Sequence, residues 1–336
     1  MKNRILKKIL IIQTASLGDV ILTTPVIEKL HAVFPESQID FLLKYGYQDV
    51  FKDHPFVHRV IVWDKSEKKY HHLKELIQVI RDRKYDAVIN IQRFVSSGLI
   101  TALSGAKIKI GFNKNPLSLF FTKSIKHTLN KKNGVLHETD RNLKLVEDLT
   151  GEKNKFPVRL YPSAHDDAKM SPYKTKAYIT ISPGSLWFTK TYPENKWVEM
   201  ISSVDNDLNV YLLGSKDDAG LCDNIKLKSK HPNCLNLSGK LTFLESAALM
   251  RDAMMNYTND SAPLHLASSV NAPVTAIYCS TIPEFGFGPL SDKSFIVQTN
   301  KILKCRPCGI HGLNTCPEGH FECAISIENR QLLENQ

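Results

Sequence analysis

Apolar and polar positions along this chain alternate between two periods, and the alternation predicts a regular succession of strands and helices. Short apolar runs are followed by longer segments in which apolar residues recur at helical spacing. Strands that alternate with helices indicate a parallel sheet with helices on both faces. In the first half we expect strands at Lys8–Gln13, Gln38–Leu43 and Tyr85–Ile91, and helices at Asp19–Val33, His72–Arg83 and His137–Leu149.

The succession breaks near residues 150–175 and then resumes, which predicts two domains. The break is polar and rich in turn-forming residues, as in Gly151–Lys155 and Tyr161–Asp167. We therefore expect an α/β protein of two Rossmann-like domains, 1–165 and 166–336, that face a central cleft with ligands at the carboxyl ends of their strands. The second domain would include a cysteine-rich tail and a C-terminal helix. Its expected strands are Ala177–Ile181, Asn209–Leu213, Cys234–Leu237, Met255–Thr258, Val274–Tyr278 and Ser294–Val297, and its expected helices are Glu194–Val204, Asp218–Lys228 and Thr242–Arg251.

Composition narrows the classes of function. The chain is 42% hydrophobic and 23% charged, which is typical of globular proteins and excludes wholesale disorder. No uninterrupted apolar run reaches the roughly 18 residues of a membrane span, and the first residues do not form a secretion signal, so we expect a cytoplasmic protein. The net charge of +10 indicates an anionic partner without choosing among nucleic acid, membrane and phosphorylated glycan.

A glycine-containing turn follows the first expected strand and leads into a helix. The segment Thr14–Pro25 reads TASLGDVILTTP and puts Asp19 at the helix start, beside the expected cleft. A carboxylate at that place could take a proton from a bound hydroxyl group. It could equally cap the helix, because aspartate favours helix starts and the helix dipole keeps it ionised. The spacing alone does not decide between catalysis and capping.

Three loops of the second half also follow expected strands. Ser182–Trp197 carries Lys190 among hydroxyl groups, which suits a phosphate but also describes an ordinary solvated lysine. Leu212–Asp218 offers carboxylates to sugar or ribose hydroxyls, or simply caps the next helix. Asn256–Ala267 ends a strand and begins a helix whose N-terminus could hold a diphosphate. His265 in that helix could equally be a packed first-turn histidine.

Together, the order and spacing of these motifs resemble glycosyltransferase family 9, the heptosyltransferases of lipopolysaccharide inner-core synthesis, which have a GT-B fold. The resemblance runs from about Ile9 to the C-terminus. Its most specific parts are Ser16–Pro25, Thr189 and Lys190 with Pro193 and Trp197, and Asn259–Ala267.

The resemblance implies a role for each motif. In that family the aspartate matching Asp19 is the proposed general base, and the lysine matching Lys190 contacts donor phosphate. The acidic residue matching Asp218 contacts the ribose, although glutamate is more common there, and the segment matching Asp260–His265 cradles the sugar diphosphate. Ala262 replaces a usual glycine in that segment. The implied catalytic residues are Asp19 and Lys190, the donor-binding residues are Thr189, Lys190, Asp218, Asp260, Ser261, Ala262 and His265, and the acceptor-binding residues are Ser16, Gly18, Arg93, Lys123 and Lys126.

The implied reaction is an inverting, metal-independent transfer of heptose from ADP-heptose to the lipopolysaccharide inner core, without a cofactor. The identity of the donor comes entirely from the resemblance. One alternative is a family member that uses another nucleotide sugar or glycan acceptor. Others are a nucleic-acid-binding protein, for which no recognisable readout element is present, and a silent lectin-like binder, against which the retained Asp19 and Lys190 argue.

The positive charge is concentrated in one stretch of the first half. Between Ala87 and His137 there is no Asp or Glu, whereas the stretch holds eight of the chain's Lys and Arg residues. Residues 116–127 mix apolar and basic side chains, a combination that suits the surface of an anionic membrane. We expect this stretch to dock a phosphorylated lipid A-type acceptor at the cytoplasmic face of the inner membrane. The alternative is a solvated basic face with a few core aromatics.

The tail contains four of the seven cysteines. Cys305, Cys308, Cys316 and Cys323 have a spacing that could bind a structural zinc ion in tetrahedral geometry. Redox-sensitive or merely packed thiols are the alternatives, and we favour an enzyme without a metal.

Overall fold

The structure is a computed structural model that describes residues 6–65, 69–128, 130–131, 134–151 and 153–334. It divides into two compact units, Met1–Tyr161 and Pro162–Gln336, which we call unit 1 and unit 2. Each unit is described by itself. Within the described residues, none of the helices combines the length and the apolar character needed to cross a membrane.

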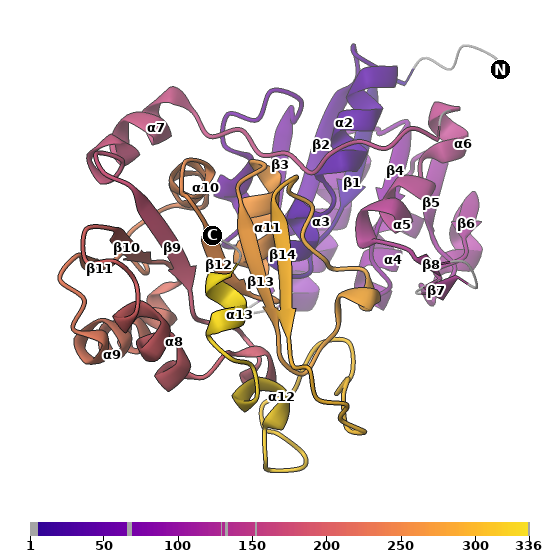
Figure 1. The fold of residues 1–336 in the computed structure, drawn as a ribbon. Coiled ribbons are helices and arrows are strands. Elements are labelled where there is room, and N and C mark those ends of the chain that lie inside the picture. Colours follow the sequence, from indigo (N-terminus) through magenta and orange to yellow (C-terminus); the bar gives the residue numbers. More distant parts are fainter. Residues whose placement is uncertain (1–5, 66–68, 129, 132–133, 152, 335–336) are drawn as a thin grey trace. The chain divides into compact units, whose positions relative to one another are not determined.

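Unit 1 is built on a six-stranded sheet in which every neighbouring pair of strands is parallel (Figure 1). The strand order is β3-β2-β1-β4-β5-β6, so the order reverses between β1 and β4. The strands are β1 (Lys8–Ile12), β2 (Gln38–Lys44), β3 (Arg59–Trp63), β4 (Ala87–Asn90), β5 (Ile108–Phe112) and β6 (Lys123–Ile125), and a small hairpin adds β7 (Asn130–Lys131) and β8 (Gly134–Val135). The helices are α1 (Leu17–Ile21), α2 (Thr24–Val33), α3 (Lys69–Asp82), α4 (Val95–Leu103), α5 (Glu138–Lys144) and α6 (Glu147–Thr150), with 3-10 turns η1 (Gln48–Phe51) and η2 (Ser118–Phe120).

The central strands of unit 1 are apolar because helices cover both faces of the sheet. In β1 every residue after Lys8 is buried, as expected for a strand inside a parallel sheet. Leu10 belongs to a core cluster with Leu73, Leu76 and Ile80 of α3, which recur at helical spacing. The alternation of apolar runs and helical segments in the sequence therefore arises from the two-sided burial of this sheet.

The expected helix Asp19–Val33 is two helices in the structure, so that prediction is wrong in its continuity. Pro25 lies in the first turn of α2 and cannot donate a backbone hydrogen bond to the preceding turn. The hydroxyl groups of Thr23 and Thr24 donate to the carbonyls of Asp19 and Ile21, each at 2.8 Å. These hydroxyls complete the last turn of α1, where a continuous helix would have used backbone N–H groups.

The acid-free stretch contains elements that the sequence pattern did not reveal, namely α4, β5 and β6. The N-cap of α4 is Phe94, which has no side-chain capping bond, and the helix includes a glycine at position 98. β6 is only three residues long. Without a cap signal or a long apolar run, these short elements have little local signature and are held by the rest of unit 1.

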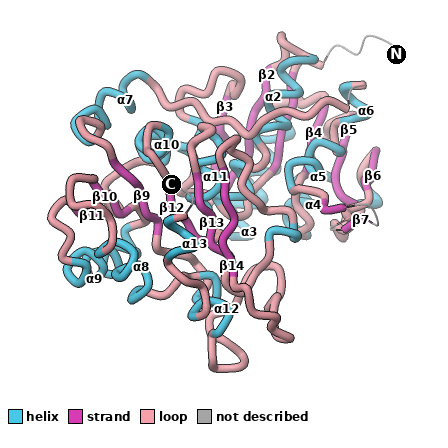
Figure 2. Tube along the Cα trace, viewed as in Figure 1, coloured by secondary structure: helices cyan, strands magenta, loops and turns pink. Residues whose placement is uncertain are grey.

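Unit 2 repeats the architecture of unit 1. Its six parallel strands have the order β11-β10-β9-β12-β13-β14, which reverses between β9 and β12 (Figures 1 and 2). The strands are β9 (Tyr178–Ser182), β10 (Asn209–Leu212), β11 (Cys234–Asn236), β12 (Asn256–Asn259), β13 (Val274–Tyr278) and β14 (Ser294–Gln298). The helices are α7 (Ala164–Met170), α8 (Glu194–Ser202), α9 (Ala219–Ser229), α10 (Phe243–Arg251), α11 (Ala262–Ser269), α12 (Glu322–Ile325) and α13 (Arg330–Leu333), with 3-10 turns η3 (Ser171–Tyr173), η4 (Phe188–Lys190), η5 (Lys216–Asp218) and η6 (Pro283–Phe285).

The cysteine-rich tail is part of the core of unit 2. Phe321, Cys323 and Leu332 are buried in one cluster with Trp197 of α8 and Ile181 of β9. The tail thus covers the same sheet face as α8, and unit 2 is complete only when the tail is in place.

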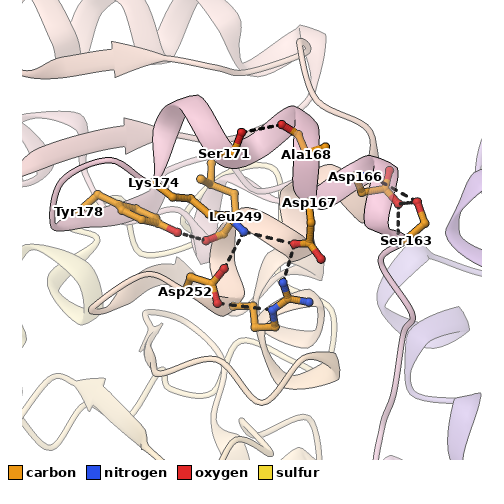
Figure 3. A network of polar contacts seen from close by, with 10 residues as sticks. Ser163, Asp166, Asp167, Ala168, Ser171, Lys174, Tyr178, Leu249 and Asp252 are labelled. Atoms are coloured by element: carbon orange, nitrogen blue, oxygen red, sulfur yellow. Dashed lines mark hydrogen bonds and ion pairs between the residues drawn. The ribbon is translucent and has the colours of Figure 1, made fainter.

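A network of charges holds α7, the first helix of unit 2, against α10 (Figure 3). Lys174 lies 3.3 Å from a carboxylate oxygen of Asp167 and 2.6 Å from one of Asp252. Arg251 contacts the same two carboxylates. Burial alone would raise the pKa of Asp252, but the hydrogen bond and charge of Lys174, followed by those of Arg251, outweigh burial and lower it.

We predict that this network stabilises unit 2 at neutral pH and not in acid. Because the folded-state pKa of Asp252 is lowered, its contribution is present above the unfolded value of about 4 and is lost as the pH falls through the folded value. Asp252→Asn should lower the melting temperature at pH 7 by no more than about 4 °C, since the pair is partly exposed. The difference from the unchanged protein should vanish in acid. Asp207→Asn, at another exposed carboxylate of unit 2, is the control. If Asp252→Asn lowered the melting temperature equally at every pH, the ionised Asp252 carboxylate would not be the source of the stability.

Candidate functional site

Each sheet has one place where the strand order reverses, and the loops there carry the sequence motifs. In open parallel sheets, ligands bind beyond the carboxyl ends of the strands at this place. In unit 1 the loops that follow β1 and β4 lead to Asp19 and Arg93. In unit 2 the loops that follow β9 and β12 lead to Lys190 and Asp260.

Asp19 is both a capping residue and a partly exposed carboxylate at this edge. Ser16 is the N-cap of α1, and its backbone N and Oγ donate to Asp19 Oδ2 at 3.1 and 2.6 Å. The backbone N of Asp19 donates in return to Ser16 Oγ at 3.3 Å. Ser16 is exposed, Asp19 is half-buried, and Gly18 between them is buried. Capping and catalysis by Asp19 are therefore compatible, because both hydrogen bonds that Ser16 donates go to the same carboxylate oxygen, Oδ2.

Buried charges lie close to Asp19. Arg141 is 1% exposed, and its Nε donates to Glu138 Oε2 at 2.7 Å. Burial raises the pKa of Glu138; the Arg141 charge acts against this rise, and the Asp19 charge adds to it. Burial also lowers the pKa of His127 to about 4, and the charges of Arg93 and Arg141 lower it further. The structure thus brings Arg93 and Asp19 into one charged region at the carboxyl edge.

Two other expected acceptor-binding residues lie on or beside the edge strand of unit 1. Lys123 is in β6 and forms an ion pair with Asp148 of α6, so part of its charge is already balanced. Lys126 follows the strand and is exposed.

An ion pair joins the two central loops of unit 2. Lys190 Nζ lies 2.7 Å from Asp260 Oδ2, and the two side chains are only 14% and 7% exposed. Thr281 Oγ1 donates to the same carboxylate oxygen at 2.6 Å. A buried ion pair is favourable only when further hydrogen bonds satisfy it, and Thr281 supplies one. The pair fixes the lysine ammonium group at the carboxyl ends of β9 and β12.

Asn259, the last residue of β12, fixes the loop that carries Lys190. Its Oδ1 accepts from the backbone N of Tyr192 at 3.0 Å, and its Nδ2 donates to the carbonyl of Pro183 at 2.7 Å. Both ends of the loop after β9 are therefore tied to one buried amide side chain.

Asp218 lies against two glycines in the loops that follow the neighbouring strands β9 and β10. The backbone N and Oγ of Ser215 donate to Asp218 Oδ2, both at 2.7 Å. A Cβ atom on Gly184 would lie 2.1 Å from Asp218 Oδ1, and one on Gly214 would lie 2.8 Å from Asp218 Cβ. The carboxylate thus packs directly on the backbone of both loops, which leaves no room for a side chain at either glycine.

The remaining expected donor-binding residues differ in exposure. Ser261 is the N-cap of α11 and, like Ala262, is partly exposed. His265 is 5% exposed and Thr189 is 1% exposed. Thr189 Oγ1 accepts from the backbone N of Leu313 at 2.8 Å, so its hydroxyl also connects η4 to the tail.

Comparison with known proteins identifies the family. The model of Glycosyltransferase family 9 (heptosyltransferase) matches residues 73–311, well over half of the chain. The chain is a family 9 glycosyltransferase.

Individual relatives agree with this assignment. The chain is 28% identical over 281 residues to lipopolysaccharide heptosyltransferase 3 of Escherichia coli, covering 79% of this chain and 81% of the relative. The solved structure of E. coli ADP-heptose lps heptosyltransferase II matches with a TM-score of 0.79 at 19% identity, covering 98% and 97% of the two chains. A glycosyl transferase family 9 structure from Veillonella parvula matches at 0.80 and 23%, covering 98% and 95%. The expected family and the expected α/β GT-B fold are confirmed.

The thiols of this family 9 enzyme form no metal cluster in the described part of the chain. All seven cysteines are free, and no group of three or more His, Cys, Asp or Glu residues there is arranged to hold a metal ion. Cys305 Sγ lies 3.9 Å from His320 Nε2. Burial raises the pKa of Cys323 to about 11 and also raises that of Cys308. Such thiols are poor nucleophiles at neutral pH, because little thiolate is present.

Several residues that shape the family 9 site were not identified from the sequence. Arg306 donates to the carbonyls of Cys279 and Thr281, both at 2.7 Å, and so holds the end of β13. A Cβ atom on Gly312 would lie 2.8 Å from Lys190 Cγ, which places the tail directly against that lysine. These residues lie far along the chain from the motifs. Gly312 has a positive φ of +79°, a conformation that favours glycine, so a glycine in this loop was the one local signal in the sequence.

We predict that Thr189 stabilises the fold through the hydrogen bond that connects it to the tail. Thr189→Val should leave the N–H of Leu313 and the hydroxyl of Ser280 without their acceptor and lower the free energy of unfolding by about 1–3 kcal/mol. Thr191→Val is the control, because that hydroxyl makes only a long 3.3 Å bond to the Trp187 carbonyl. Urea denaturation of both variants measures the difference, and equal stabilities would show that the connection contributes nothing.

Proposed function

We propose that this protein is an inverting heptosyltransferase that moves heptose from ADP-heptose to the inner core of lipopolysaccharide. Membership of family 9 supports sugar transfer. The names of its relatives, a lipopolysaccharide heptosyltransferase and an ADP-heptose lps heptosyltransferase, support the donor and the acceptor. The observation that carries the mechanism is a pair of charged groups: a carboxylate, Asp19, at the reversal point of one sheet, and a lysine, Lys190, at that of the other.

On the acceptor side, Asp19 is the proposed general base. An acceptor hydroxyl gives its proton to the carboxylate while its oxygen forms a bond to the anomeric carbon of the donor. The bond between that carbon and the diphosphate oxygen breaks from the opposite side, so the configuration inverts and ADP leaves. Ser16 holds Asp19 Oδ2, which directs the carboxylate, and Arg93 supplies a positive charge for an anionic acceptor.

On the donor side, Lys190 and the first turn of α11 are the proposed diphosphate site. The ammonium group and the N–H groups at a helix start supply fixed positive charge as the leaving diphosphate gains negative charge. Asp260 is anionic, so we assign it to holding Lys190 and to the sugar hydroxyls and not to the phosphates. We assign Asp218 to accepting hydrogen bonds from the ribose hydroxyls, and its packing on two glycines supports this role by fixing the carboxylate.

We further propose that residues 1–165 bind the acceptor and residues 166–336 bind the donor, and that the enzyme works at the cytoplasmic face of the inner membrane. The basic, acid-free stretch of unit 1 supports an anionic glycolipid acceptor. Nucleic acid is not the proposed partner, and no metal or other cofactor takes part in the proposed steps.

A transfer assay with a panel of nucleotide sugars tests the proposal. ADP-heptose with an acceptor of lipid A bearing the first inner-core sugars should give a product larger by one heptose in mass spectrometry, together with free ADP. Transfer only from another nucleotide sugar would replace the donor assignment and keep the enzyme class. Absence of transfer from every donor in the panel would reject the proposal.

We predict that Asp19→Asn abolishes most turnover and leaves folding nearly unchanged. The amide oxygen can still accept the bonds from Ser16, but it cannot take a proton. Turnover should fall by roughly 10² to 10⁴, the usual contribution of a positioned base. Asp166→Asn is a matched control, because Ser163 and Asp166 form the same capping box at α7. Full activity of Asp19→Asn would reduce Asp19 to a cap.

We also predict that Gly184→Ala weakens nucleotide binding. The new methyl group would occupy the place of Asp218 Oδ1 and push the carboxylate away. The affinity for ADP, measured by calorimetry, should fall by at least about tenfold, or 1.4 kcal/mol. Gly220→Ala is the control, since a Cβ atom there meets nothing within 4 Å. Unchanged affinity in both variants would remove Asp218 from the donor site.

A further inference from the structure

Unit 1 has a group of exposed apolar side chains that the proposed chemistry does not use. Phe94 and Val95, at the start of α4, are 62% and 53% exposed, and Leu119 and Phe120, in η2, are 93% and 63% exposed. Large apolar side chains that gather on an exposed surface usually mark an interaction site. We call these four residues the apolar tip.

The two segments that carry the apolar tip are held together by Asn115. Asn115 is 1% exposed, and its Nδ2 donates to the carbonyl of Phe94 at 3.0 Å. A Cβ atom on Gly98 would lie 2.3 Å from Asn115 Oδ1 and 3.0 Å from Leu117 Cβ. The loop between β5 and β6 therefore packs directly on the first turn of α4, which brings together the two segments that carry the apolar tip.

The charged residues on the chain segments that carry the apolar tip are all basic. Arg93 and Lys114 are exposed and come from the same loops. Lys126 is also exposed and follows β6, where the N–H of the next residue, His127, donates to Asn113 Oδ1 at 3.1 Å. No Asp or Glu occurs between Ala87 and His137. Exposed aromatic and leucine side chains among basic residues are the combination that enters the headgroup region of anionic bilayers, where apolar burial and charge attraction add.

We propose that the apolar tip inserts into an anionic lipid bilayer and that the surrounding basic residues bind its headgroups. This proposal rests on the proposed function and deepens it by naming the surface that meets the membrane. The segments of the tip follow the carboxyl ends of β4 and β5, and the loop of Asp19 follows the carboxyl end of β1 in the same parallel sheet. Insertion at this edge places the base near the headgroup plane, where a lipid-anchored acceptor presents its sugars.

Vesicle flotation with the full chain tests the surface. The probes are vesicles of phosphatidylethanolamine with phosphatidylglycerol, and vesicles of phosphatidylcholine alone. The double variant Leu119→Ser with Phe120→Ser should bind the anionic vesicles at least about tenfold more weakly than the unchanged protein, at low and at high salt. The control, Leu227→Ser with Ile302→Ser, removes side chains that are 76% and 100% exposed in unit 2 and should bind normally. Equal binding by both double variants overturns the proposal.

Charge and insertion can be measured separately. Lys114→Gln with Lys126→Gln should weaken binding mainly at low salt, because exposed charges are screened at high salt. Phe120→Trp should show a blue shift of tryptophan emission when anionic vesicles are added, and quenching by brominated lipid. An emission spectrum that does not change on binding means that the tip stays in water and overturns insertion.

Two acceptors separate this proposal from the proposed function. The double variant Leu119→Ser with Phe120→Ser should keep its turnover on a delipidated, water-soluble core oligosaccharide and lose it on acceptor embedded in vesicles. Loss on both acceptors would assign the tip to the sugar site and overturn a membrane role. The flotation result does not depend on turnover, so it stands even if heptose transfer fails. A dimer that the double variant converts to a monomer, without vesicle binding by the unchanged protein, would identify a second copy as the occupant.

Discussion

Burial of the central strands on both faces is the constraint from which the rest of each unit follows. β4, β9, β12 and β13 have no exposed residue. Water does not reach the side chains of a strand enclosed in this way. A polar group there destabilises the fold unless it is hydrogen-bonded. Chemistry is therefore displaced to the strand ends, and parallel pairing gathers those ends at one edge of each sheet.

The pair of Lys190 and Asp260 illustrates how much structure a charged group at such an edge requires. Thr281 hydrogen-bonds to the carboxylate, Arg306 holds the backbone of Thr281, and Gly312 leaves room beside the lysine stem. None of these supporting residues is adjacent to Lys190 in sequence. Lys190 is therefore held in place by residues that are distant from it in the sequence. Electrostatic catalysis depends on charged groups that are fixed in this way before the reaction.

Most of the architecture could be predicted from the sequence, because a strand that is buried on both faces requires an apolar run of strand length. Val274–Tyr278 was predicted with its observed bounds. The failures had physical causes: Pro25 and two threonine hydroxyls divide a helix that the apolar pattern makes continuous. Motif order led to Asp19 and Lys190, whose roles remain predictions, whereas the partners of these residues were invisible because a hydrogen bond between distant loops leaves no local pattern. Buried Arg141 and Thr281 are examples of residues that the sequence did not reveal for this reason.

The packing of the tail into unit 2 has a consequence for how the protein is made. Domains fold as units during synthesis, N-terminal first, so unit 1 can form while the ribosome is still translating the second half. The sheet face behind β9 stays uncovered until residues as late as Leu332 have left the exit tunnel, since they fill the same cluster as Ile181 and Trp197. The nascent chain thus carries a finished first unit and an open second one until this segment has emerged. A fusion partner attached after Leu332 must leave that final segment free to fold back.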